Sequence, residues 1–303
     1  MFRHIPVISW FDKDTIRHLR LPFSFYLLPV YLFSLSQAIS IAPSSAITGF
    51  VILHFFVFPA TNGYNSYQDK DETSIGGLKY PPKVSVNLLY ASLMLEVIAI
   101  LSALLVTPVF SVMIFIFLLM SHLYSYRGIR LKRYPITAFM IVFIFQGAFV
   151  YMMSAECIQP HSLAGLFNTG QILCLPVSSL FIGSMYPLTQ IYQHKADKED
   201  GVISISYMLG YKGTFVFSGA LFAMATTLLI VYFAGISRLL FVLLFIACIL
   251  PVVLRLSRWF AEVRKDPARA DFENTMVINR ISAVCMNLFF ILIFFLNHKF
   301  GTR

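Results

Sequence analysis

The sequence predicts an all-α integral membrane protein with about nine transmembrane helices around a cavity that faces the cytoplasm. Of the 303 residues, 58% are hydrophobic and only 12% are charged, and the mean hydropathy is +0.77. Apolar runs close to the roughly 20 residues that cross a hydrocarbon core recur along the whole chain. This composition excludes an ordinary soluble domain.

Nine apolar runs give the expected helices in order along the chain. A basic stretch, residues 11–24, comes first, and its Pro22 suits the first turn of a helix. We interpret this stretch as an anchor at the lipid headgroups. Each run is long enough, or nearly so, to cross about 30 Å of hydrocarbon at about 1.5 Å per residue. The expected spans are 22–40, 42–61, 86–106, 108–124, 135–154, 168–192, 212–233, 237–254 and 278–297.

Lysine and arginine are distributed unevenly between alternate loops, which sets the expected orientation. With the N-terminus inside, the inner segments hold 20 of the 23 Lys and Arg residues, and the outer segments hold Arg238, Lys299 and Arg303. Positive charge marks the cytoplasmic side. We therefore expect a multi-pass protein of the bacterial inner membrane with a cytoplasmic N-terminus and an external C-terminus. Because the net charge of +9 is spread over these loops, we expect membrane lipids as partners and no nucleic acid.

Two loops and four cysteines complete the expected topology. Residues 155–168 form the longest outer loop, where we expect Glu156 at the surface. Residues 255–277 predict an interfacial helix, with a lid over a functional site as the alternative. The cysteines have no paired spacing, which favours buried free thiols. A disulfide between Cys157 and Cys174 is the alternative.

Two polar triads stand at the ends of apolar runs on the expected cytoplasmic side. Asn62, Asn65 and Asp69 are spaced so that they share one face of a helix. The same spacing returns 128 residues later in a second triad made of Gln190, Gln193 and Asp197. Oxygen-bearing side chains stacked on one face suit Mg²⁺, which usually shares its ligands with a phosphate.

The repetition of the triad decides between two interpretations. A single polar helix end can simply cap and solvate a membrane helix. Two triads with identical spacing on the same side of the membrane favour a metal site built from both. The repetition also predicts that the single domain, residues 1–303, consists of two pseudo-repeated halves, at about 1–134 and 135–303.

The motifs resemble those of the UbiA-type intramembrane prenyltransferases, which carry one motif of the form N-D-x-x-D-x-x-x-D and a second of the form D-x-x-x-D. The first motif here reads Asn62-Gly-Tyr-Asn65-Ser-Tyr-Gln-Asp69, with amides at two positions where acids often stand. The second reads Gln193-His-Lys-Ala-Asp197, with glutamine in the place of the first acid. The resemblance covers nearly the whole chain, and the stretches NGYNSYQDKDE and YPLTQIYQH are similar to a bacterial subgroup of the family.

The resemblance implies Mg²⁺-dependent transfer of an isoprenyl chain from a prenyl diphosphate to an aromatic or other lipophilic acceptor. It implies that Asp69 and Asp197 are the catalytic metal ligands and that Asn65 and Gln193 add neutral oxygen ligands. Cations that bridge the diphosphate oxygens stabilise the leaving group when the carbon–oxygen bond ionises.

Other residues of the motifs and the inner loops are expected to contact the diphosphate. The glycines before Lys79 permit a tight loop that returns it over the first triad, and the stretch LYSYRGIRLKRYP resembles a family segment between the fourth and fifth helices. Ordinary positive-inside charge is the alternative for each basic residue. The expected contacts are Asn62, Lys79, Tyr124, Arg130, Lys132 and Gln190, with Arg20 as a further candidate.

Four acidic residues outside the triads are possible members of the site. Asp71, Glu72 and Asp200 lie next to the motifs and can supply the negative charge that the amides lack, or remain solvated. Glu96 is expected to be the only acid within a span. It can accept the proton that an aromatic acceptor loses, or it can hydrogen-bond a neighbouring helix while protonated.

Two alternatives from other functional classes stay open. The amide-for-acid changes are compatible with a catalytically silent protein that binds prenyl lipids. Polar helix ends in repeated halves are also compatible with a small membrane transporter, although the chain has few polar residues near the middle of its spans.

Overall fold

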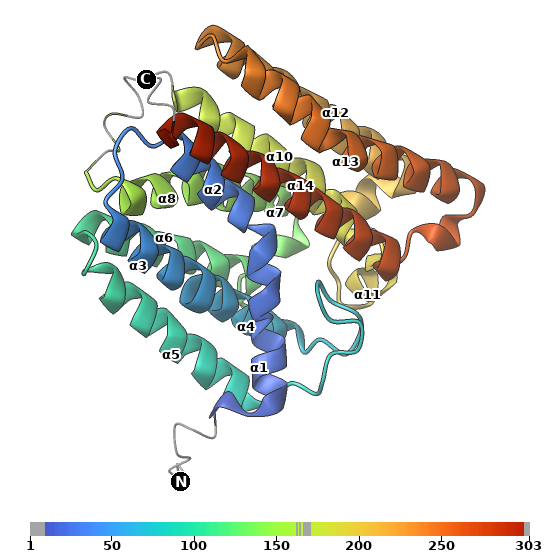
Figure 1. Cartoon of the computed structure of the whole chain (residues 1–303). Coiled ribbons are helices and arrows are strands. Elements are labelled where there is room, and N and C mark those ends of the chain that lie inside the picture. Colours follow the sequence, from blue (N-terminus) through green and yellow to red (C-terminus); the bar gives the residue numbers. More distant parts are fainter. Residues whose placement is uncertain (1–9, 162, 164, 166–170, 300–303) are drawn as a thin grey trace.

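The computed structural model describes residues 10–161, 163, 165 and 171–299. Apart from an isolated bridge between Ile75 and Leu78, the regular structure of these residues is helical. The helices pack side by side as a bundle, with α4 and α5 on one side and α12 and α13 on the other (Figure 1). The expected all-α membrane fold is confirmed.

The first part of the chain, up to residue 134, contains four long helical spans. Proline stands at the start of several helices, where its missing N–H costs nothing. Helix α4 ends at Asp69, and the following Lys70, with a φ of +54°, closes the last turn in the left-handed conformation. The elements are α1 (Lys13–Leu19), η2 (Leu21–Tyr26), α2 (Leu28–Gln37), α3 (Pro43–Val51), the π-helical η3 (Ile52–Val57), α4 (Phe58–Asp69), α5 (Val86–Ala103), α6 (Pro108–Ser125) and η4 (Leu131–Arg133).

The second part contains five long spans, of which the first has a π-helical centre. Helix α12 starts where the Ser204 hydroxyl accepts a hydrogen bond from the Tyr207 N–H at 3.2 Å. The elements are α7 (Pro135–Val142), the π-helical η5 (Phe143–Phe149), α8 (Val150–Ile158), η6 (Gln171–Leu173), α10 (Cys174–Gln190), α11 (His194–Glu199), α12 (Ile205–Gly235), α13 (Leu239–Lys265), η7 (Pro267–Arg269) and α14 (Phe272–Lys299).

The number of spans agrees with the sequence. Within the described residues, eight helices are long and apolar enough to cross a membrane, and a ninth span is formed if the bent pair Lys13–Tyr26 and Leu28–Gln37, with a 40° bend, counts as one. The chain is therefore a multi-pass membrane protein. The expected external C-terminus, residues 300–303, and the first nine residues lie outside the described residues.

The expectation of an interfacial helix at 255–277 is wrong. Helix α13 continues without a break to Lys265, and α14 already begins at Phe272. Trp259 is fully buried and packs edge-on against Phe215 at 4.8 Å. Residues 255–265 therefore extend α13 beyond its apolar run, and residues from Phe272 onward already belong to α14. The tryptophan is buried because the helices still pack against each other in this region.

The expected outer loop at 155–168 is partly helical. Helix α8 runs to Ile158, and Glu156 is almost completely buried, with its carboxylate accepting a hydrogen bond from the Thr107 hydroxyl at 2.9 Å. Glu156 is thus a second acid within a span, which corrects the expectation that Glu96 is the only one. All four cysteines are free, and Cys157 and Cys174 are buried, as expected.

The second polar triad does not share one helix face. Helix α10 ends at Gln190, a turn follows, and Asp197 lies on the separate short helix α11. Ile191 in this turn is fully buried in an apolar cluster with Leu188 and Trp259. Burial of Ile191 bends the chain, so the spacing that suits a helix does not produce one here.

Candidate active site

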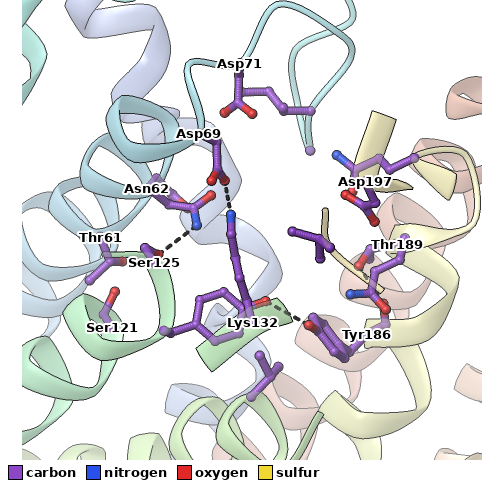
Figure 2. A pocket seen from close by; sticks show the side chains of 18 of the residues that line it. Thr61, Asn62, Asp69, Asp71, Ser121, Ser125, Lys132, Tyr186, Thr189 and Asp197 are labelled. Carbon is purple, nitrogen blue, oxygen red and sulfur yellow. Dashed lines mark hydrogen bonds and ion pairs between the residues drawn. The ribbon is translucent and has the colours of Figure 1, made fainter. Parts of the chain in front are cut away.

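A cavity of about 610 Å³ lies among the ends of α4, α6, α10 and α11. Both polar triads line it, although they are separated by more than 120 residues of chain. Figure 2 shows Asp69 and Asp71 on one side of this cavity and Asp197 on the other. The two motifs are therefore brought together at one cavity.

The first triad is held by helix α4. Asn62, Asn65 and Asp69 all lie on its cavity-facing side. The amide nitrogen of Asn65 donates a hydrogen bond to the Ser125 hydroxyl at 2.8 Å, which joins α4 to α6. The amide oxygen of Asn65 takes no part in this bond. The left-handed residue Lys70 then turns the chain so that Asp71 also lines the cavity.

Basic residues from the segment between α6 and α7 surround the acids. Lys132 forms an ion pair with Asp69 and lines the cavity. Arg130 is buried behind Asp69, at 3.4 Å from its carboxylate, and forms a second ion pair with Asp200. Arg127 adds a 3.3 Å ion pair with Asp200 that the sequence did not predict. This segment thus ties the first motif to the second.

Burial changes the pKa values of the carboxyl groups at the cavity. Burial and the neighbouring charge of Asp69 raise the pKa of Asp71 to about 6. Burial also raises the pKa of Asp197 to about 7, although the charge of Lys132 opposes this shift. Asp200 behaves differently, because Arg130 outweighs the effect of burial and holds its pKa below the usual value. Asp71 and Asp197 are therefore carboxylates that lack a sufficient countercharge.

The charges that line the cavity suit a divalent cation. Six acids line it among the described residues, namely Asp69, Asp71, Glu72, Asp197, Glu199 and Asp200, against the three cations Arg20, Lys70 and Lys132. No group of three or more His, Cys, Asp or Glu in the described part of the chain is arranged to hold a metal ion alone. Mg²⁺ needs no such group, since it is usually held by one or two carboxylates together with substrate phosphates. The residues present therefore fit this ion when a phosphate completes its ligands.

Arg20 lines the cavity from the junction of α1 and η2. Its guanidinium donates to the carbonyl oxygens of Gly76 at 3.2 Å and Asn62 at 3.3 Å and lies 5.4 Å from the ring centre of Phe23. A Cβ atom on Gly76 would lie 2.7 Å from Cζ of Phe23. A side chain at position 76 would therefore have to displace the Phe23 ring.

Two predicted residues lie elsewhere. Lys79 is exposed and forms an ion pair with Glu273 instead of returning over the first triad. The Glu96 carboxylate is 2.9 Å from Nε2 of His122, whose ring stacks on Tyr64 at 3.8 Å. Neither Lys79 nor Glu96 lines the cavity. Glu96 thus contacts the neighbouring helix α6 through His122 and does not face the cavity.

The inner part of the cavity contains the predicted Tyr124 and several polar residues that the sequence did not single out. Tyr124 and Tyr186 share a hydrogen bond of 2.8 Å between their hydroxyl oxygens, and Thr61, Ser121 and Thr189 lie nearby (Figure 2). Tyr186 stands one helical turn before Gln190, so its spacing from the motif was the available signal. Tyr26, Ile182 and Met185 line both this cavity and a smaller apolar one of about 100 Å³.

Comparison with known proteins places the chain in a family. The model of the UbiA prenyltransferase family matches residues 26–281, which is most of the chain. No curated protein sequence matches significantly.

Solved structures with the same fold include a UbiA homolog from Archaeoglobus fulgidus bound to DMAPP and Mg²⁺, with a TM-score of 0.67, 14% identity and coverage of 93% of this chain and 99% of that one. A UbiA homolog from Aeropyrum pernix K1 has a TM-score of 0.65 at 20% identity, with 90% and 98% of the chains covered. A digeranylgeranylglyceryl phosphate synthase has a TM-score of 0.59 at 18% identity, with 93% and 96% covered. The protein belongs to the UbiA prenyltransferase family.

Proposed function

We propose that the protein transfers an isoprenyl chain from a prenyl diphosphate to an aromatic or other lipophilic acceptor in a Mg²⁺-dependent reaction. One observation carries this proposal: Asp69 of the first motif and Asp197 of the second line one cavity, and Asp197 and the neighbouring Asp71 lack a sufficient countercharge there. The A. fulgidus homologue with the same fold is described as bound to DMAPP and Mg²⁺. A prenyl diphosphate with Mg²⁺ is the ligand that matches both the acidic mouth and the apolar interior.

Asp69 and Asp197 would hold Mg²⁺ together with the amide oxygens of Asn65 and Gln193, and Asp71 is placed to join them. When bound, Mg²⁺ supplies electrostatic stabilisation of the leaving diphosphate. Asn62 and Gln190, one turn further in, would orient the diphosphate.

The basic residues would hold the diphosphate oxygens. Lys132 is best placed, since it lines the cavity between the two motifs, and Arg20 faces the same space. Arg130 would act by holding Asp69 and Asp200 in place. The carbon–oxygen bond at C1 of the prenyl group breaks, pyrophosphate leaves with both bonding electrons, and the acceptor forms the new bond to C1. The proton that the acceptor loses is released to water or pyrophosphate.

The apolar side chains would bind the isoprenoid tail and exclude water from the allylic cation. Phe117 and Phe145 line the inner cavity, and aromatic faces stabilise a cation. Ile182 and Met185 also line the smaller apolar cavity between α2, α10 and α14. We place the mouth of the site at the cytoplasmic face of the bacterial inner membrane, on the basis of the Lys and Arg distribution.

A silent prenyl-lipid binding protein is the second candidate, because Lys132 and Arg130 already neutralise Asp69. The test is release of pyrophosphate by purified protein from geranyl to geranylgeranyl diphosphate, with phenolic and alcohol acceptors, in Mg²⁺ or EDTA. We expect Mg²⁺-dependent release coupled to a prenylated product. Tight Mg²⁺-dependent binding without turnover for any acceptor would favour the silent binder. Absence of binding would contradict both.

A further inference from the structure

Gln146 is a polar residue at the inner end of the cavity. It lines the cavity from the π-helical segment η5, and it lies 11 residues after Pro135, or about 16 Å into the bundle at about 1.5 Å per residue. The cavity is also lined by apolar and aromatic side chains of the same helical span, Ile141, Val142 and Phe145, and of other helices, Phe117 and Ile182. Its side chain makes no hydrogen bond to any residue in the described part of the chain.

The backbone around Gln146 is fixed against helix α10. Gly147 packs so closely on Ser179 that a Cβ atom there would collide with the Ser179 backbone. The Ser179 hydroxyl accepts a hydrogen bond from the Ala148 N–H at 3.0 Å, which satisfies a donor within the π-helical segment. The Gln146 side chain is therefore presented to the cavity by a constrained segment.

The inner end of the cavity has no charged residue among those described. The charged residues that line the cavity all belong to its mouth: the last residue of α4, the loop after it, η4, α11 with the residue that follows it, and the α1–η2 junction. Figure 2 shows the acids at one end and Thr61, Ser121 and Tyr186 further in. A carboxylate bound beside Gln146 would be buried without a cation, which is strongly unfavourable.

The amide of Gln146 is also unsuited to contact with an isoprenoid tail. A hydrocarbon chain leaves both the donor and the acceptor of an amide unpaired. The smaller cavity, which shares the lining residues Tyr26, Ile182 and Met185 with this one, has a mostly apolar surface and suits a hydrocarbon chain better. The inner cavity thus has two ends of different chemistry, one for hydrocarbon and one for a group that hydrogen-bonds.

We propose that Gln146 binds the polar head of the acceptor, and that this head is uncharged, such as a hydroxyl, quinol or carboxamide, and not a carboxylate. This rests on the proposed function, which it deepens by naming the acceptor class. The amide of Gln146 donates to and accepts from such a head, while the nucleophilic atom of the acceptor faces C1 of the prenyl group nearer the mouth.

The test compares wild type with Gln146→Leu, which keeps the size and removes the hydrogen bonds, and Gln146→Asn, which keeps the amide. Ile144→Ala is the matched control, since Ile144 lies on the exposed side of the same segment. Each protein receives geranyl diphosphate with neutral phenols and quinols, in which the head hydroxyl and the nucleophilic ring carbon are separate atoms. A matched pair, 1,4-dihydroxynaphthalene and its 2-carboxylate, tests charge. Binding of each acceptor is also measured calorimetrically with geranyl thiodiphosphate and Mg²⁺ present.

We expect wild type to prefer neutral acceptors, and Gln146→Leu to weaken acceptor binding and raise acceptor KM by about tenfold, with donor KM unchanged. Gln146→Asn should retain part of the binding, and Ile144→Ala all of it. Three results would each overturn this inference alone. The first is that Gln146→Leu raises the donor KM and leaves acceptor binding unchanged. The second is that wild type uses the 2-carboxylate as well as 1,4-dihydroxynaphthalene, and the third is that wild type binds geranyl thiodiphosphate but no acceptor. Absence of Mg²⁺-dependent donor binding would instead overturn the proposed function.

Discussion

Lys132 forms an ion pair with Asp69 and also lies close enough to Asp197 to oppose the rise in its pKa. One ammonium group therefore acts on both motifs from the centre of the cavity (Figure 2). When a diphosphate and Mg²⁺ bind, Lys132 is the cation that can exchange its carboxylate partner for a phosphate oxygen.

Replacing Lys132 by alanine should weaken binding of geranyl diphosphate by about 10- to 100-fold, since a hydrogen bond to a charged group contributes about 1.5–3 kcal/mol. Calorimetric titration with Mg²⁺ present measures this. Arg133→Ala is the control, because Arg133 is exposed and packs on Tyr134 at 4.8 Å. Equal losses in both variants would mean that only the general positive charge of the loop matters.

The raised pKa of Asp197, about 7, predicts that stabilisation by Mg²⁺ depends on pH. Protons compete with Mg²⁺ for this carboxylate below pH about 7, so the apparent Kd for Mg²⁺ should rise by up to about tenfold per pH unit as the pH falls. Without metal, the stability of the folded protein changes with pH in the opposite direction. The folded protein binds more protons than the unfolded chain between pH about 4 and 7, so its stability falls as the pH rises through that window.

Thermal unfolding in detergent from pH 5 to 8, with and without Mg²⁺, measures both effects. The increase in Tm caused by Mg²⁺ should be largest at pH 8 and nearly absent at pH 5. Asp197→Asn should flatten both curves. A wild-type Mg²⁺ effect that does not vary with pH would show that Asp197 is not a ligand.

Glu96→Gln should leave transfer activity within about threefold of wild type and lower stability by about 1–3 kcal/mol, because it weakens a partly buried hydrogen bond to His122. Activity and denaturant unfolding of the variant are compared with those of wild type. A large fall in kcat with normal donor binding would mean that Glu96 accepts the proton from the acceptor after all.

Gly76→Ala should loosen the loop over the cavity, since its Cβ atom would meet the Phe23 ring at 2.7 Å. Donor KM should rise several-fold, and the double variant with Phe23→Leu should recover much of the loss, because the smaller side chain makes room. A double-mutant cycle on donor KM gives the coupling. Additive losses would show that this contact does not control the loop.

The helices were predictable because each apolar run carries its own signal, whereas their ends were not. Helix α13 runs past the apolar run to Lys265, since the buried Trp259 packs against Phe215. The turn before α11 depends on burial of Ile191. Both features are set by contacts between helices that are distant in sequence.

The residues of the site that belong to a repeated motif could be predicted from the sequence. Single polar residues outside the motifs could not. The six triad residues all line the cavity as expected, because their spacing and charge stand out in an apolar sequence. Lys79 was misplaced, since its loop is held by Glu273. Gln146 gave no signal, because a lone amide in an apolar run does not reveal which side of the helix faces a cavity.

The central claim is that the two motifs form one Mg²⁺–diphosphate site, and the most direct test is binding of geranyl thiodiphosphate to purified wild type, Asp69→Asn and Asp197→Asn, with Mg²⁺ or EDTA. The account predicts tight binding by wild type only with Mg²⁺, and a loss of at least about tenfold in each variant. Binding that is unaffected by EDTA, or that survives both substitutions unchanged, would contradict it.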